Sequence, residues 1–195
     1  MRTPVERAQD EIVVKHSRFI AIAQPVANQQ EARDELVRIK KQYDSATHVV
    51  HAFQVGPSGE VQGMSDDGEP QGTAGRPVLD VIRGSCLTNV LVTVVRYFGG
   101  TLLGTGGLVR AYGESARRVL SLCKTQEYTP TTPFSFTADY ATYQSVKLLF
   151  KEYGVSMLDE DFGEQVAASG IIASSRKDSF VQQLKDISRG RIVCT

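Results

Sequence analysis

The chain has 195 residues, of which 41% are hydrophobic, and its 22 Lys and Arg residues balance 22 Asp and Glu residues. Because the net charge is zero, no overall field would draw the molecule onto nucleic acid or an anionic membrane, and any electrostatic recognition must be local. Three widely spaced cysteines, and the lack of any signal-like or membrane-spanning apolar run (about 20 residues), predict a cytoplasmic protein with reduced thiols and no membrane partner.

The N-terminal quarter of the chain alternates between strand and helix patterns. The β-branched and apolar stretch from 11 to 26 predicts two consecutive strands joined by a turn at residues 15–17. Asn28 is placed to cap a helix over 29–42, in which apolar residues recur at three- and four-residue spacing. A strand over 47–55 is expected to follow.

Glycine-rich segments flank the most apolar stretch of the chain. Residues 56–76 contain six glycines and two prolines and predict a long loop, of a length that is often functional. A helix over 77–85 is expected next, followed by an apolar run at 89–97 that is typical of a central strand buried on both faces. The Gly-rich segment 99–107 then leads into a helix predicted over 108–123.

The polar, Pro-containing segment 129–133 separates two domains, which are expected at 1–130 and 134–195. The second domain has the order strand, helix, strand, strand, helix, strand, which is the ferredoxin-like βαββαβ pattern. Its strands are expected over 134–140, 155–161, 165–173 and 190–194, and its helices over 142–153 and 177–188. The sequence therefore predicts the α+β fold class with two domains.

The Gly-rich segment is the first candidate binding site. Helix N-termini attract anions, and glycines let the backbone approach a phosphate closely. No Gly-Lys-Ser/Thr follows, and Val109 stands where a dinucleotide fingerprint would have its third glycine, so neither nucleotide motif is present. A tight turn where helix and strand pack closely is the alternative interpretation. The candidate glycines are Gly99, Gly100, Gly104, Gly106 and Gly107.

Positive charge gathers around this segment. Between residues 81 and 124 there are six basic residues and one acidic residue. Arg96, Tyr97 and Phe98 place a guanidinium beside two aromatic rings, a combination suited to phosphate contact and base stacking, and Arg110 follows the glycines on the next helix. Alternatively, Arg96 pairs with acidic residues and the two rings pack in the core.

Three carboxylates lie close together in the long loop. Asp66, Asp67 and Glu69 repel one another and therefore require a cation, amide donors or arginine partners. Calcium loops need a longer alternation of ligands, so we predict a structural role in which an aspartate caps a turn and pairs with Arg96 or Arg110. The supporting residues of this carboxylate loop are Gly72, Thr73 and Gly75.

The two histidines on the expected strand 47–55 do not form a zinc pair. His48 and His51 are three residues apart, so their side chains should point to opposite faces of the sheet. No Ser-His-Asp or Cys-His arrangement is recognisable either. The sequence therefore predicts no catalytic residue, no metal site and no cofactor, and it favours a protein that is not an enzyme.

Two longer strings carry a resemblance to a known family. SDDGEPQGTAGRP at 65–77 and VVRYFGGTLLGTGGLVRAYG at 94–113 resemble the signature of the YigZ/Impact family of uncharacterised, translation-associated proteins. The resemblance covers residues 10–125, and the C-terminal pattern is similar to the second domain of the bacterial branch. The residues that fit a further family motif upstream are Ala46, Thr47, His48, Ala52 and Phe53.

The resemblance implies an N-terminal domain similar to domain IV of elongation factor G and to a ribosomal small-subunit protein domain. It also implies a ferredoxin-like C-terminal domain similar to domain V of elongation factor G. The chain departs from the family where residues 101–103, Thr-Leu-Leu, replace a frequent Ile-Lys-Leu, and where Val49 and Val50 replace Asn-Cys. The Gly-rich segment therefore lacks the positive charge of the family lysine, and no role of that cysteine is carried over.

The residues and the resemblance support three hypotheses from different classes. The first is a non-enzymatic RNA- or ribosome-binding protein in translation or its stress regulation, with Arg96 and Arg110 on phosphate. The second is a phosphate- or nucleotide-binding protein, or an enzyme, that uses the Gly-rich segment. The third is an interaction module whose ferredoxin-like sheet offers an edge strand to a protein partner. The sequence predicts no particular oligomeric state.

Overall fold

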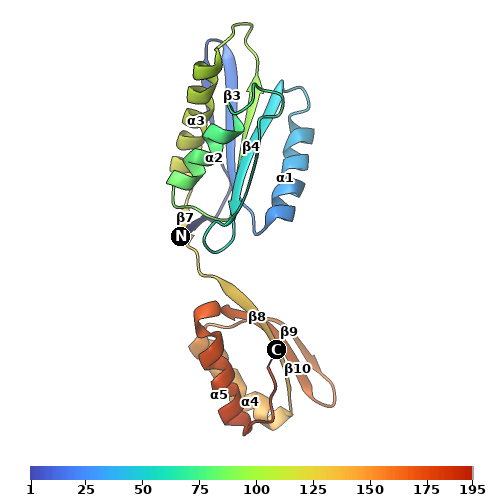
Figure 1. The fold of residues 1–195 in the computed structure, drawn as a ribbon. Helices are drawn as coiled ribbons and strands as arrows, with labels where there is room; N and C mark the ends of the chain where they lie inside the picture. Colours follow the sequence, from blue (N-terminus) through green and yellow to red (C-terminus); the bar gives the residue numbers. More distant parts are fainter. Residues whose placement is uncertain (195) are drawn as a thin grey trace. The chain divides into compact units, whose positions relative to one another are not determined.

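Residues 1–194 are described by a computed structural model, in which the chain forms two compact units, Met1–Tyr128 and the part from Thr129 onward (Figure 1). Both units combine helices with antiparallel sheets, so the predicted α+β fold class is confirmed. No helix within residues 1–194 is long and apolar enough to cross a bilayer.

The first unit is built on a five-stranded antiparallel sheet. Its order is β2, β3, β6, β4, β5, so β6 lies in the middle although it is the last of these strands in the chain. The strands, with a separate pair formed by β1 and β7, are β1 (Arg2–Pro4), β2 (Ala8–Val14), β3 (Ser17–Pro25), β4 (His48–Val55), β5 (Val61–Ser65), β6 (Val90–Tyr97) and β7 (Thr125–Glu127).

Helices cover both faces of this sheet. α1 (Gln29–Gln42) packs on one face, and α2 (Gly75–Gly84) and α3 (Thr105–Leu122) pack on the other (Figure 1). Alternate residues of β6 therefore enter different cores: Val92 packs with the residues of α2 and α3, and Val95 packs on the side of α1. Burial on both faces explains the nearly continuous apolar sequence of β6, and the predicted central strand is confirmed.

Local sequence patterns form the expected structure near the N-terminus. The turn between β2 and β3 lies at Lys15 and His16, whose φ angles are positive at 45° and 66°. The Asn28 side chain accepts a hydrogen bond from the backbone N–H of Glu31 over 2.9 Å. This bond satisfies an amide that has no partner within the helix, so the predicted cap of α1 is confirmed.

Several elements differ from the prediction: β1 and β7 were not expected, and β8 (Thr131–Ala138) begins within the segment expected to link the domains. A loop and two helix starts also differ. The expected loop over 56–76 contains β5, which pairs with β4 at the edge of the sheet. Gly63 contributed to the prediction of a loop, but it lies within β5. A Cβ at this position would lie 2.3 Å from the ring of Phe53, so close packing requires glycine here. α2 and α3 begin earlier than predicted, at Gly75 and Thr105, because their first turns accommodate the glycines that indicated a loop.

The second unit has a three-stranded antiparallel sheet of order β8, β10, β9. Its aromatic core includes Phe134 and Phe180, whose ring centroids are 5.0 Å apart. The elements are β8 (Thr131–Ala138), α4 (Tyr140–Tyr153), β9 (Ser156–Phe162), β10 (Val166–Ala173), the short 3-10 turn η1 (Ser174–Arg176) and α5 (Lys177–Ser188). The predicted βαββα order of this unit is confirmed.

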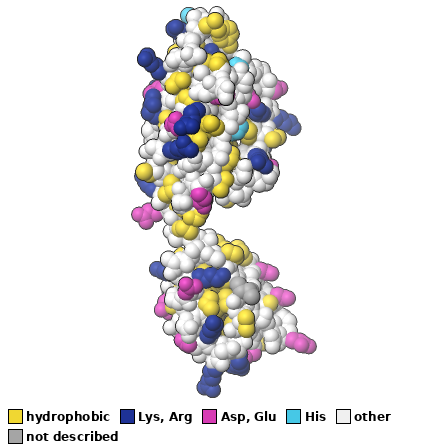
Figure 2. All heavy atoms as spheres, in the orientation of Figure 1, with side chains coloured by type: hydrophobic (Ala, Val, Ile, Leu, Met, Phe, Trp, Pro, Cys, Tyr) yellow, Lys and Arg dark blue, Asp and Glu magenta, His cyan; other side chains and the backbone are white. Residues whose placement is uncertain are grey.

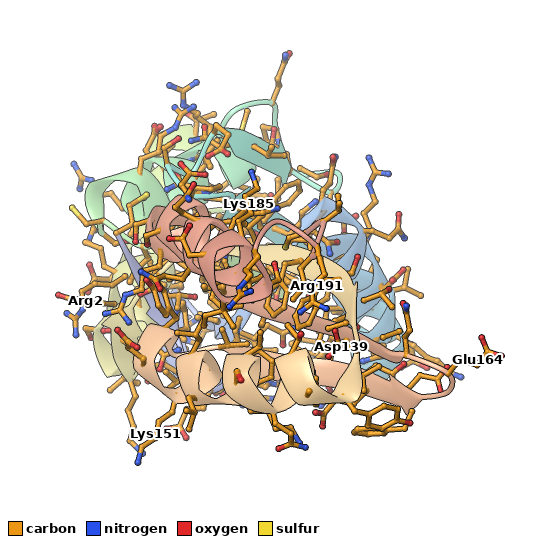
Figure 3. All side chains as sticks on the ribbon, turned by 90° about the horizontal axis from the view of Figure 1, so that it is seen from below. Arg2, Asp139, Lys151, Glu164, Lys185 and Arg191 are labelled. Carbon is orange, nitrogen blue, oxygen red and sulfur yellow. The ribbon has the colours of Figure 1, made fainter. Side chains whose placement is uncertain are left out.

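The final strand predicted over 190–194 is wrong, because this segment has no strand structure. Ile192 instead packs into the core of the second unit. Arg191 donates from Nη1 to Oδ2 of Asp139 over 3.0 Å, at the residue that caps α4, and the two side chains lie together in Figure 3. Side-chain contacts therefore hold this segment in place of a backbone hydrogen-bond ladder.

Candidate functional site

A pocket of about 390 Å³ opens where β6 ends and the Gly-rich segment begins. Its lining includes His48, Glu69 and Arg96, together with Phe98 and the segment 102–105. The β2–β3 turn and the loop between β6 and α3 lie at this same end of the first unit (Figure 1). The pocket therefore joins three candidate regions of the sequence: the His48 motif, the carboxylate loop and the Gly-rich segment.

A buried polar network forms the floor of this pocket. Arg96 donates from Nη1 to Oε1 of Glu69 over 2.6 Å, and the two side chains are 6% and 4% exposed. The hydroxyl of Tyr112 donates to the same oxygen over 2.7 Å, and Nη2 of Arg96 donates to Oγ of Ser17 over 3.3 Å. Burial, followed by the nearby Glu69 carboxylate, raises the pKa of Tyr112 above its ordinary value, so the hydroxyl remains a donor.

The burial of Arg96 corrects the prediction that this guanidinium contacts phosphate on the surface. It pairs with Glu69 instead, as the alternative interpretation proposed. The two neighbouring aromatic residues differ from each other. Tyr97 packs on the core beside α1, whereas Phe98 is 45% exposed, with the guanidinium of Arg96 5.6 Å from its ring centroid. Phe98 therefore remains available at the surface.

The ring of His48 is held in a defined orientation. Its Nδ1 lies 2.8 Å from the backbone carbonyl oxygen of Asp67, which can only accept, so Nδ1 carries the proton. Nε2 then faces Oε1 of Glu69 at 3.8 Å. In the pairing of β4 with β6, His48 lies opposite Arg96. The next residue of β4, Val49, points to the other face of the sheet and packs in the core beside α1. His51 lies on that other face, so the prediction that the two histidines diverge is confirmed.

The three carboxylates have different partners. Oxygens of Asp66 accept the backbone N–H groups of Gly72, Ala74 and Gly75 over 2.8, 3.1 and 2.8 Å, and so cap the start of α2. Partial burial opposes ionisation of Asp66, but these three donors hold its pKa below the usual range. The predicted aspartate cap is thus present in this loop, where Thr73 also donates from Oγ1 to the carbonyl of Pro70.

Asp67 pairs with Lys40 and accepts the backbone N–H of Val49 over 2.7 Å. Burial opposes ionisation of Asp67, but Lys40 and this amide hold the pKa of its carboxyl below the usual range. Only Glu69 meets an arginine, so the prediction that Asp66 or Asp67 pairs with Arg96 or Arg110 is wrong. The physical reason is that the three residues face different elements. Asp66 faces the start of α2, Asp67 faces α1 and β4, and Glu69 faces β6 and α3, so each carboxylate meets different donors.

The glycines of the 99–107 segment differ in their surroundings. A Cβ on Gly99 would lie 2.0 Å from the backbone carbonyl carbon of His16, so this glycine allows the β2–β3 turn to approach. Gly104 has φ of 74° and precedes α3, where no side chain caps the helix. Gly100 and Gly106 face open space, and Gly107 lies against Leu103. The segment is therefore a tight turn that leaves the first amides of α3 free of a side-chain partner.

Arg110 lies outside the pocket. It lines a neighbouring hollow together with Lys15 and Glu114, and it forms no ion pair with any residue of the described chain. Lys15, on the β2–β3 turn, is likewise exposed and unpaired among those residues. Lys15 was not anticipated from the sequence, because its proximity to Arg110 depends on the packing of the turn on the Gly-rich segment.

Two further participants, Tyr112 and Ser17, were also missed. Tyr112 lies in the buried apolar stripe of α3. Because a buried Tyr O–H usually has a hydrogen-bond partner, a tyrosine in this stripe could have indicated a polar contact in the core. Ser17 carries no comparable signal, because its contact with Arg96 is set by the pairing of β3 with β6. The structure thus brings together His48, Glu69, Arg96, Phe98 and Gly104. It leaves Arg110 and Asp66 apart, and Asp67 meets this group through its backbone carbonyl at His48.

Comparisons with known proteins agree on one family. Residues 15–120 match the model of the Impact N-terminal domain, and residues 136–191 match a domain of unknown function (DUF1949). An IMPACT family member of Haemophilus influenzae is 38% identical over 182 residues, which cover 92% of this chain and 88% of the relative. The IMPACT family member YigZ of Escherichia coli is 33% identical over 181 residues, covering 92% and 89%.

A solved structure gives the same result for the fold. The crystal structure of a hypothetical protein matches with a TM-score of 0.77 at 31% identity, covering 99% of this chain and 95% of that chain. The match to the Impact N-terminal domain spans more than half of the chain and includes every residue that lines the pocket. The chain therefore belongs to the Impact family.

Proposed function

We propose that this protein is a non-enzymatic RNA- or ribosome-binding protein that acts in translation or its stress regulation. The observation that carries the proposal is the composition of one end of the first unit, which we name the tip and define as Lys15, Phe98, Leu102 and Arg110. All four side chains are exposed, Phe98 to 45% and Leu102 to 82%. Lys15 and Arg110 line a hollow that shares Leu103 with the pocket of Phe98. Single-stranded RNA requires phosphate contact and base stacking, which unpaired cations and an exposed aromatic ring can supply.

Several cations of the first unit outside the tip are paired, whereas Arg7, Arg33 and Lys41 form no ion pair among residues 1–194. Arg18, Arg118 and Lys124 are each neutralised by a carboxylate within 2.9 Å. Lys and Arg side chains are interspersed with acidic and hydrophobic ones on the visible face of each unit (Figure 2). A protein with zero net charge can bind a polyanion only where its cations are locally uncompensated, which supports the tip as the contact surface.

Co-sedimentation with ribosomes across a salt series tests the proposal. We expect binding that weakens as salt rises and that is lost in the double variant Lys15→Glu/Arg110→Glu, because phosphate contacts release counterions. The matched control is Arg7→Glu/Arg33→Glu, which changes the charge by the same amount at two exposed arginines outside the tip. Equal loss in both double variants, or no binding of the unaltered protein at low salt, would contradict the proposal.

A further inference from the structure

The pocket beside the tip has one wall that is suited to an oxyanion. α3 is 18 residues long, begins after Gly104, and has no side-chain cap at its N-terminus. Its first amides have no partner within the helix, since the first intrahelical bond is made by Leu108 N–H to Gly104 over 2.9 Å. Gly104 and Thr105 line the pocket, so the positive end of this helix dipole borders the space inside.

The floor of the pocket supplies an independent indication of a ligand. The Glu69 side chain is 4% exposed, and both hydrogen bonds it receives go to Oε1. No donor within residues 1–194 reaches Oε2 of Glu69, and Nε2 of His48 also lacks a hydrogen-bond partner there. Both atoms are free to accept and belong to residues that line the pocket, so this floor is suited to the N–H groups of a bound molecule.

Much of the remaining lining of the pocket is apolar. Phe98, Leu102, Leu103 and Pro70 line the pocket, and Leu102 is 82% exposed. One face of the Phe98 ring lies against the guanidinium of Arg96, 5.6 Å from the ring centroid, and the ring is 45% exposed elsewhere. Apolar walls with a few convergent polar groups are typical of a small-molecule site, and an exposed aromatic ring is suited to stacking on a nucleobase.

We propose that this pocket binds one nucleoside monophosphate unit. The base stacks on Phe98 and lies against Leu102, its N–H groups donate to Glu69 Oε2 and His48 Nε2, and its phosphate lies at the first turn of α3. An inorganic anion alone would leave the Glu69 oxygen without a donor, and an uncharged base would leave the helix amides without an acceptor. The unit can be a free nucleotide or an unstacked nucleotide of a bound RNA; only the second case rests on the proposed function.

Titration of the full chain with AMP, CMP, GMP and UMP tests the inference, with backbone amide chemical shifts as the readout. We expect at least one nucleotide to shift the amides of residues 104–108, and the matching nucleoside and inorganic phosphate each to bind roughly tenfold more weakly or worse, because each supplies half of the contacts. No saturable shift with any of the four at millimolar concentration, or shifts confined to residues outside the pocket, would overturn the inference.

The variant Thr105→Glu separates ligand binding from folding. A carboxylate at the first position of α3 stabilises the helix dipole but repels a phosphate from the same place, so we expect a stable protein whose nucleotide affinity falls roughly tenfold or more. Thr101→Glu is the matched control, since Thr101 is exposed, lies in the same loop and does not line the pocket. Equal nucleotide affinity in the two variants would overturn the inference.

Co-sedimentation of these two variants with ribosomes distinguishes the two sources of the nucleotide. If RNA supplies the unit, Thr105→Glu weakens co-sedimentation more than Thr101→Glu, and free nucleotide competes. If the ligand is a free nucleotide, both variants co-sediment equally while Thr105→Glu alone loses nucleotide binding. Nucleotide binding without any co-sedimentation would refute the proposed function and leave the pocket assignment standing.

Discussion

Glu69 and Arg96 form a buried ion pair in which Nη1 of Arg96 lies 2.6 Å from Oε1 of Glu69. The variant Arg96→Met should destabilise the protein by about 3–5 kcal/mol, because it leaves the Glu69 carboxylate buried without its cation. The double variant Arg96→Met/Glu69→Met should be less destabilised than the single one, since it removes both charges. Urea unfolding followed by circular dichroism measures both. A double variant less stable than the single one would contradict this account of the pair.

Asp66 should control the start of α2. Asp66→Ala removes the acceptor for the amides of Gly72, Ala74 and Gly75, and we expect a loss of stability of about 0.5–2 kcal/mol, the range observed for helix caps. Hydrogen exchange of these three amides should accelerate more than that of amides in α1. Unchanged exchange at 72–75 would show that the carboxylate does not hold this turn.

Gly99 should be intolerant of any side chain. The Cβ of Gly99→Ala would lie 2.0 Å from the carbonyl carbon of His16, so the β2–β3 turn must shift, at a cost of about 1–3 kcal/mol or more. Gly106→Ala is the matched control, because its Cβ meets open space within α3 and alanine favours the helix by about 0.5–1 kcal/mol. Thermal unfolding of both variants compares them, and equal stability would exclude the proposed close approach.

His51 should make the protein less stable in acid. Burial, with a smaller effect of Lys40, lowers the pKa of His51 to about 4, whereas the unfolded chain has the ordinary value near 6.5. The unfolded state therefore binds more protons between these values, so the contribution is complete above about pH 6.5 and declines as the pH falls towards 4, by at most about 3 kcal/mol. Nδ1 of His51 also has no partner among residues 1–194.

The variant His51→Leu removes this titrating group. Unfolding free energies measured from pH 7 to pH 4 should fall less steeply for His51→Leu than for the unaltered protein. His16→Leu, at an exposed histidine of the β2–β3 turn, is the matched control. A slope that is identical in all three proteins would indicate that His51 is not the group responsible.

Much of the fold was predictable because its determinants are local. Asn28 and the three-to-four-residue spacing of apolar residues specified α1, and the continuous apolar run specified the central strand β6. The errors concern the short strands β1, β5 and β7 and residues 190–194, where a short, glycine-containing or terminal segment has no pattern that separates pairing from packing. In these places the neighbouring segment, and not the local sequence, determines whether a backbone ladder forms.

The sequence by itself determined the elements, the Gly-rich turn and the set of candidate polar residues. Only the tertiary structure decided which of them meet: Glu69 and Arg96 are 27 residues apart in the chain and lie within 2.6 Å, while Asp66 and Asp67 turn to other donors. Helix periods and caps depend on residues a few positions apart, which the sequence displays directly. The partner of a buried charge depends on strand register and on helices packing across the sheet, and these are properties of the whole fold.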